Sequence, residues 1–323
     1  MTTTVHAAPP FDAELKPVLD VVGQSLSPTL TLDDLPALRA NPGTPTLDQL
    51  LAGRPLTHEE RVIPGPAGGP DVVVSIFRRA DQKPGGPAFF FTHVGGMIFG
   101  DRFTGISTIT PWVELLDAVL VTVEYRLAPE HPAPAALEDS YAALLWTAAH
   151  ADELGFDPAR LVTVGASAGG GLAAGLTLMA RDNDGPALAA QILMWSMLDE
   201  HNDSVSSHQI DGIGVWDRNS NDMGWTALLG DRRGTDRVTQ YESPSRAVDL
   251  TGLPPTYLEV GSAEVFRDET VAYATAIWAA GGVAELHVWP GGFHLFELFA
   301  PQAALSTAAR DTRTAWVRRT LDA

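Results

Sequence analysis

Short apolar runs alternate with helical patterns along most of the chain, from residue 71 to its end. Seven runs are predicted to be strands: residues 72–77, 88–92, 119–125, 161–164, 191–195, 256–260 and 285–289. Helices are predicted over residues 135–150, 170–181, 269–280 and 305–321. Strands that alternate with helices favour a parallel sheet, so we expect an α/β fold with a mostly parallel sheet and helices on both of its faces.

Two regions depart from this alternation. Apolar residues at helical spacing within residues 1–50 predict short helices ahead of the sheet. Residues 200–236 are rich in Asp, Asn, Ser and Gly, yet they contain Trp216, Met223 and Trp225, which is more apolar bulk than an exposed loop needs. We expect one domain over the whole chain, 1–323, with a small helical cap made by the two regions. The alternative for the second region is a satellite core without substrate contact.

Charge and composition limit the partners of the protein. The 323 residues carry a formal net charge of −19, spread without an acidic block. Such a surface repels nucleic acid and anionic lipid, so neither is an expected partner. The chain has no Cys, which excludes disulfides, a thiolate nucleophile and zinc held by Cys. We find neither a signal-peptide pattern nor the roughly twenty apolar residues of a membrane span, so a cytoplasmic protein is expected.

A serine between glycines is the strongest chemical signal in the chain. Ser167 is the centre of a G-x-S-x-G pattern at residues 165–169, where a predicted strand gives way to a helix. Such a tight turn lifts the serine clear of its neighbours. Glu264 and His294 each follow a predicted strand further along, so we expect a catalytic triad of Ser167, His294 and Glu264. Asp268, one helical turn after Glu264, is the alternative acid.

A glycine-rich turn supplies the second signal. His93, Gly95 and Gly96 follow the predicted strand 88–92. Acyl transfer passes through a tetrahedral oxyanion, which backbone N–H groups on such a turn stabilise. We expect the N–H groups of Gly95, Gly96 and Ala168 to form this oxyanion hole, and His93 to brace the loop by hydrogen bonding.

Four further residues are candidates for contact with substrate: Val94, Met97, Trp216 and Trp225. Val94 is the least expected of them, because a β-branched residue is strained at positive φ. Its side chain is expected to narrow the pocket near the oxyanion hole. The alternative is that Val94 points into the core.

These motifs resemble those of the hormone-sensitive-lipase-like esterases, bacterial family IV of the α/β-hydrolase superfamily. Residues 125–132 are close to the family's YRLAPEHP segment, residues 264–269 stand where the family has DPLRDE, and residues 290–294 match its PGxxH. The resemblance extends from about residue 62 to residue 321. It implies the α/β-hydrolase fold and a serine carboxylesterase that hydrolyses small esters with short acyl chains, with no metal and no organic cofactor.

The chain departs from the family pattern at three positions. Val94 replaces the first glycine of HGGG, Ala166 replaces a polar residue before the nucleophile, and Glu264 stands where Asp is usual. Glutamate serves as well as aspartate where it reaches the imidazole, because the acid has only to hold one tautomer and stabilise the imidazolium.

Other functions fit the same scaffold. An amidase or a lactonase would use the same triad, and neither fold nor triad separates them from an esterase. A non-catalytic receptor for a small ligand is a further alternative, against which His294 argues. A nucleotide-binding P-loop is not expected, because Leu172 follows the glycines where that motif needs Lys. The sequence leaves a homodimer open.

Overall fold

One eight-stranded sheet organises the computed structural model, which describes residues 7–40 and 43–322. The strands are β1 Leu56–Ile63, β2 Val72–Arg79, β3 Gly86–Thr92, β4 Val119–Glu124, β5 Phe156–Ala166, β6 Ala190–Met194, β7 Thr256–Gly261 and β8 Ala284–Trp289. Their order across the sheet is β1-β2-β4-β3-β5-β6-β7-β8. β2 runs antiparallel to β1 and β4. The remaining neighbours in the sheet are parallel, so the parallel part consists of the six strands β4, β3, β5, β6, β7 and β8.

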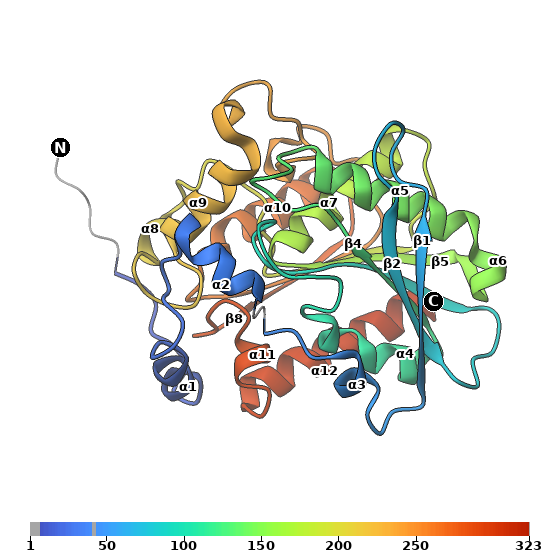
Figure 1. Ribbon diagram of the computed structural model, residues 1–323. Helices are drawn as coiled ribbons and strands as arrows, with labels where there is room; N and C mark the ends of the chain where they lie inside the picture. Colours follow the sequence, from blue (N-terminus) through green and yellow to red (C-terminus); the bar gives the residue numbers. More distant parts are fainter. Residues whose placement is uncertain (1–6, 41–42, 323) are drawn as a thin grey trace.

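Helices cover both faces of this sheet (Figure 1). Those on one face are α5 Ala135–Ala149, α7 Ala168–Asp182 and α10 Arg267–Ala279, with the short α6 Ala151–Leu154 beside α5. Those on the other are α3 Leu47–Leu51, α4 Thr110–Leu116, α11 Phe296–Phe299 and α12 Ala304–Leu321, with α1 Leu15–Val22 beside α11. The remaining helical segments are η1 Leu32–Asp34, α2 Leu35–Ala40, η2 Ile106–Thr108, α8 Val205–Gln209, α9 Arg218–Leu229, η3 Gly230–Arg232 and η4 Pro244–Arg246.

The central strands are apolar on both sides because both faces of the sheet are covered. In β3, Phe89 and Phe91 enter one core cluster, while Ala88 and Phe90 enter the cluster on the opposite face. Successive side chains of a strand point to opposite faces, so a continuous apolar run fills two cores at once. This is the physical reason for the unbroken apolar runs in the sequence.

The structure confirms the α/β fold and all seven predicted strands. The four predicted helices are also present, with bounds that differ by one or two residues. The strand that the sequence did not predict is β1, which lies at the edge of the sheet and pairs only with β2. In β1 only the two end residues are buried. Polar residues occupy most of the strand, so the sequence there has no apolar run.

Of the two regions expected to form a cap, the stretch from Thr29 to α2 lies next to α8 and α9, whereas α1 and α3 pack in the core cluster on the face of the sheet that α12 covers (Figure 1). Thr29 Oγ1 donates to Asp217 Oδ2 at 2.5 Å, and the N–H of Leu30 donates to Ser220 Oγ at 2.7 Å. These bonds tie the chain before η1 to the start of α9. Residues 1–6 and 41–42, which the sequence assigned to the same cap, lie outside the described residues.

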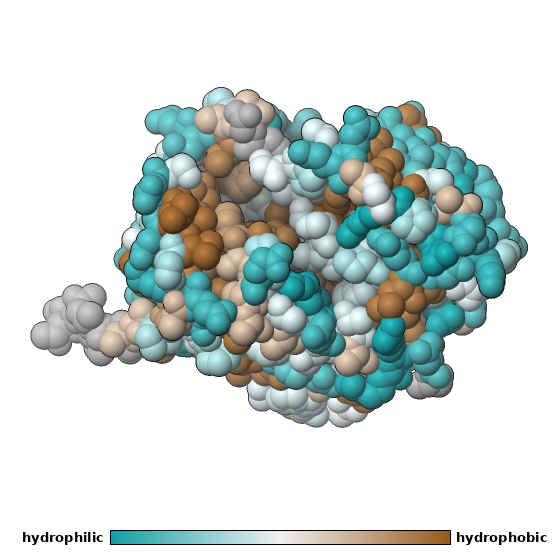
Figure 2. All heavy atoms as spheres, turned by 90° about the horizontal axis from the view of Figure 1, so that it is seen from below, coloured by the Kyte–Doolittle hydropathy of each residue, from teal (hydrophilic) through white to brown (hydrophobic). Residues whose placement is uncertain are grey.

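The surface seen in Figure 2 is mainly hydrophilic, with separate apolar patches between the polar side chains. Among the helices in residues 7–40 and 43–322, none combines the length and the apolar character that crossing a bilayer requires.

Candidate active site

Ser167 lies at the sharp turn between β5 and α7. Its backbone has φ 56° and ψ −126°, which L residues rarely adopt. A Cβ atom on Gly165 would lie 2.0 Å from the carbonyl oxygen of Gly169, and one on Gly169 would lie 2.0 Å from that of Thr92. Only glycine fits at both positions, so the local sequence permits this turn and places Ser167 at the carboxyl edge of the parallel strands.

His294 joins Ser167 to Glu264. It lies between β8 and α11, and Glu264 lies between β7 and α10. His294 Nε2 is 3.0 Å from Ser167 Oγ, and His294 Nδ1 is 2.6 Å from Glu264 Oε1. When Nδ1–H donates to the carboxylate, Nε2 is left to accept the serine hydroxyl proton. All three residues are at most 4 % exposed, so the structure brings them together in a buried site.

The longer glutamate side chain is held in place by the backbone. Glu264 Oε2 accepts the N–H of Gly261 at 2.9 Å, which leaves Oε1 for His294. Asp268, the alternative acid, points elsewhere: its carboxylate accepts the N–H of Ser206 at 2.7 Å and Arg267 Nε at 2.7 Å. The structure therefore brings Glu264, and not Asp268, to the imidazole.

The glycine-rich turn after β3 adopts backbone conformations that favour glycine. Gly95 has φ 125° and Gly96 has φ 60°. Within residues 7–40 and 43–322, no backbone carbonyl accepts a hydrogen bond from the N–H groups of Gly95, Gly96 or Ala168. Such N–H groups are able to bind an anionic oxygen.

His93 braces this turn. It is completely buried, and its ring stacks on Tyr125 with 4.0 Å between ring centroids. His93 Nδ1 lies 2.7 Å from the carbonyl oxygen of Val94, and Tyr125 Oη donates to the carbonyl oxygen of His93 at 2.9 Å. Burial lowers the pKa of His93, which favours the neutral ring and a structural role over proton transfer.

Val94 enters the core. It belongs to the apolar cluster that contains Phe91 and Ile106, and it is 5 % exposed. A Cβ atom on Gly105 would lie 3.4 Å from Val94 Cγ1, so the side chain rests on that glycine. Positive φ is confined to other residues of the turn, and Val94 is therefore unstrained. This geometry favours the core alternative and gives no support to a substrate contact of Val94.

The other three candidates lie at different depths. Met97 borders a cavity of about 10 Å³ that Leu172 and Leu228 also line. Trp216 lies against the oxyanion turn, since a Cβ atom on Gly96 would be 2.6 Å from its Cη2 atom. Trp225 is completely buried in the core cluster and does not line that cavity. Substrate contact of Met97 and Trp216 therefore stays a prediction, and Trp225 belongs to the buried core.

The sequence analysis did not single out a buried carboxyl group that lies close to the segment carrying Glu264. Glu269 on α10 accepts the N–H of Leu198 at 2.6 Å and that of Asp199 at 3.3 Å, where the chain leaves the sheet for residues 200–236. Burial raises the pKa of Glu269 well above its usual value. The signal in the sequence was its position at the end of the segment that resembles DPLRDE.

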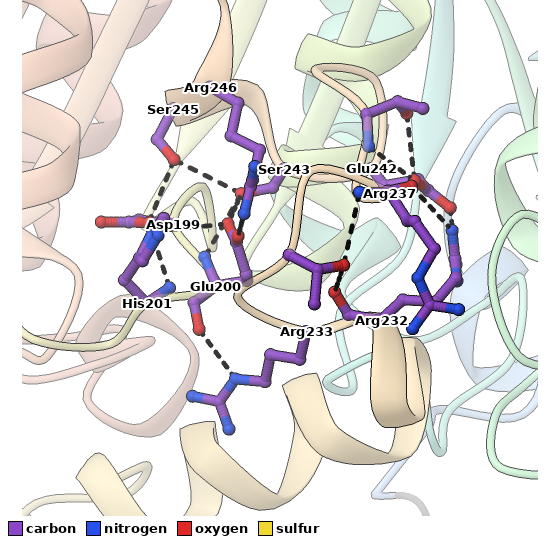
Figure 3. Close-up of polar contacts among 12 residues, drawn as sticks. Asp199, Glu200, His201, Arg232, Arg233, Arg237, Glu242, Ser243, Ser245 and Arg246 are labelled. Atoms are coloured by element: carbon purple, nitrogen blue, oxygen red, sulfur yellow. Dashed lines mark hydrogen bonds and ion pairs between the residues drawn. The ribbon is translucent and has the colours of Figure 1, made fainter.

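A cluster of polar side chains follows β6 (Figure 3). Ligand atoms of Asp199, Glu200 and His201 lie within 4.8 Å of one another, the spacing that a metal site needs. Glu200, however, is fully buried and accepts Arg246 Nε at 2.6 Å and the hydroxyl of Ser243. A cation would have to displace Arg246, so the donor set fits an ion pair better than a metal.

The comparisons with known proteins agree with this fold. The family model described as alpha/beta hydrolase fold matches residues 89–298. Esterase LipI of Mycobacterium tuberculosis (strain ATCC 25618 / H37Rv) is 32% identical over 302 residues, which cover 89% of this chain and 88% of that protein. Carboxylesterase NlhH of the same strain is 32% identical over 314 residues, which cover 95% and 96%.

A solved structure, Bacterial Heroin Esterase, superposes with a TM-score of 0.87 at 36% identity and covers 96% of this chain and 98% of its own. The chain thus has the fold of the α/β hydrolases along nearly its whole length. It belongs to the alpha/beta hydrolase fold family, in the hormone-sensitive-lipase-like esterase branch that its motifs resemble.

Proposed function

We propose that this enzyme is a serine carboxylesterase that hydrolyses small esters with short acyl chains through Ser167, His294 and Glu264. The observation that carries the proposal is the unbroken series of contacts from Ser167 Oγ through the His294 imidazole to the Glu264 carboxylate, at 3.0 and 2.6 Å. The base is within hydrogen-bond reach of the nucleophile on one side and of the orienting acid on the other.

In the proposed mechanism Ser167 Oγ attacks the ester carbonyl carbon while His294 Nε2 takes the hydroxyl proton. The oxyanion that forms is stabilised by the N–H groups of Gly95, Gly96 and Ala168. His294 then gives its proton to the departing alcohol, which leaves an acyl-enzyme. A water molecule, deprotonated by His294, attacks the acyl carbon, and return of the proton to Ser167 releases the acid. Glu264 orients the ring and stabilises its cationic form in both halves of the cycle.

The substrate would enter beneath the helical cap. A hollow of about 400 Å³ lies between Leu32 of the N-terminal region, Pro129, and Met223 of α9. The small apolar cavity at Met97 has room for about one water molecule, so little space is left there for a long acyl chain. We assign the cap to residues of about 1–50 and 200–236. A small-molecule ester as substrate, with no nucleic-acid or membrane partner, and a cytoplasmic location stay predictions, and a homodimer is left open.

The test replaces the nucleophile. Ser167→Ala should lower kcat by on the order of a million-fold, as removal of a triad serine does elsewhere, with an unchanged circular dichroism spectrum. Wild-type protein should hydrolyse aryl acetate and butyrate far faster than laurate, and an anilide hardly at all. Substantial turnover by folded Ser167→Ala would contradict the proposed nucleophile, and a preference for the anilide would favour an amidase.

A further inference from the structure

Arg313 on α12 is completely buried between two glutamates. Its Nη1 atom donates to Glu259 Oε1 and, at 3.2 Å, to Glu297 Oε1, while its Nη2 atom donates to Glu297 Oε2 at 2.8 Å. Both glutamates are buried as well. With all three groups ionised, the cluster carries one unit of negative charge inside the protein.

Stability alone does not explain such a cluster. Burial, reinforced by Glu297 and opposed by Arg313, raises the pKa of Glu259, because a second negative charge is disfavoured inside the protein. Apolar residues of the same volume often stabilise a protein as well as a buried ion pair does, or better. The position of the cluster therefore needs a further explanation.

The two glutamates lie on the segments that carry the acid and the base of the proposed triad. Glu259 is in β7, two residues before Gly261, and the N–H of Gly261 is bonded to Glu264. Glu297 is in α11, which begins two residues after His294. Arg313 on α12 thus connects β7 to α11.

The cluster also reaches the strands on either side. Glu259 Oε2 accepts Trp289 Nε1 at 3.2 Å, at the end of β8, and Tyr257 Oη at 3.1 Å within β7. The Arg313 guanidinium lies 5.9 Å from the ring centroid of Trp195, directly after β6. The preceding residue, Met194, accepts the N–H of Ser167 at 2.8 Å. Two triad-bearing segments therefore meet at the guanidinium, and the turn that carries Ser167 is linked to them indirectly, through Met194 and the neighbouring Trp195.

We propose that Arg313 is a positioning residue for the triad: by binding Glu259 and Glu297 together, it fixes β7 against α11 and thereby sets the Glu264–His294 hydrogen bond. The inference rests on the function proposed above. The planar guanidinium suits this task because it donates several bonds in fixed directions, whereas a lysine ammonium acts as one point charge.

The test uses Arg313→Lys, which keeps the charge, and Glu297→Gln, which keeps the shape of the side chain. Each should lower kcat about ten- to a hundredfold with little change in KM, because a small misplacement of the reacting groups has effects of this size. Each should also shift or broaden the downfield proton resonance of His294 Nδ1–H, assigned by its loss in Glu264→Gln. This resonance reports the Glu264–His294 bond without any substrate.

Leu154→Ala is the control for lost stability, because Leu154 is completely buried on α6 and touches none of these groups. It should lower the melting temperature but leave kcat and the resonance unchanged. Unchanged kcat and resonance in folded Glu297→Gln and Arg313→Lys would overturn the positioning role. Activity of Ser167→Ala would instead contradict the proposed nucleophile, so the two failures are distinguishable, and Glu297→Gln suffices where Arg313→Lys does not fold.

Discussion

Glu264 reaches His294 although glutamate is one methylene longer than the usual aspartate, because the N–H of Gly261 holds its second oxygen. Glu264→Gln should therefore lower kcat on the order of 10⁴-fold, by favouring the wrong imidazole tautomer. Asp268→Asn is the matched control, since Asp268 binds Ser206 and Arg267 instead. Steady-state kinetics of both variants test the assignment, and the opposite ranking would transfer the acid role to Asp268.

Glu259 gives stability a defined pH dependence. Its pKa in the folded protein is about 7, above the ordinary 4.5, chiefly because burial disfavours the carboxylate. A group with a raised folded pKa contributes stability that is fully present below pH 4.5 and is lost as pH rises through 7. Glu259→Gln should remove this dependence, so its free energy of unfolding should fall less than that of the wild type between pH 5 and pH 8. Urea melts at both pH values measure the difference, and parallel changes would contradict the prediction.

At the scale of elements, the glycine-rich turn after β3 lies in close contact with Trp216 of the segment 200–236. A Cβ atom on Gly96 would lie 2.6 Å from Trp216 Cη2, and Gly96 has φ 60°. Gly96→Ala should push the turn away from Trp216 and lower kcat about 10²- to 10³-fold, the cost of losing one oxyanion donor. Gly68→Ala, with φ 78° and no neighbour within 4 Å, controls for backbone strain alone. Equal kcat in the two variants would exclude the contact as the cause.

Elements with a continuous apolar pattern could be predicted from the sequence, and others could not. Six of the seven predicted strands are largely buried, and β8, at the other edge of the sheet, is half-buried. In contrast, β1 is an edge strand whose charged residues pair across the surface. Its register depends on β2, which lies further along the chain, so no local pattern indicates it.

The candidate site shows the same division. Ser167, Glu264 and His294 were predicted because each ends a strand within a recognisable motif. Arg313 and Glu297 were not predicted, since their pairing joins α12 to α11 and β7 and exists only once the chain has folded. The sequence likewise did not show whether the Val94 side chain points into the pocket or into the core, because its contact with Gly105 forms only in the folded protein.

At the scale of the whole molecule, Arg39 binds the N-terminal region to the segments that follow β3 and β4. Arg39 on α2 donates to the carbonyl oxygens of Ile98 and Ala128, both at 2.8 Å, and makes two bonds to Glu130 at 2.7 and 2.8 Å. The ion pair with Arg39 lowers the pKa of Glu130 to about 2, so these contacts persist at neutral pH.

Arg39→Met should loosen this region, raise KM severalfold and speed proteolysis within residues 7–40, while the triad distances and kcat change little. Lys16→Met is the control, because within the described part of the chain Lys16 pairs only with the exposed Asp20 on its own helix. Limited proteolysis and steady-state kinetics test the role. A proteolysis rate equal to that of Lys16→Met would contradict the fastening role.

The two edge strands of the sheet, β1 and β8, differ in charge, and this difference limits strand pairing between copies of this protein. A sheet edge exposes N–H and C=O groups to which a foreign strand can pair. β1 presents three charged residues in succession, Glu59, Glu60 and Arg61, whose ion pairs such a strand would have to break. β8 carries the half-exposed Val288 and no comparable charged run. A fibre grows by edge pairing only where both edges of every copy accept a strand. Because the charged β1 edge disfavours pairing and only the β8 edge is open to it, two copies could pair through β8 and no third copy could add.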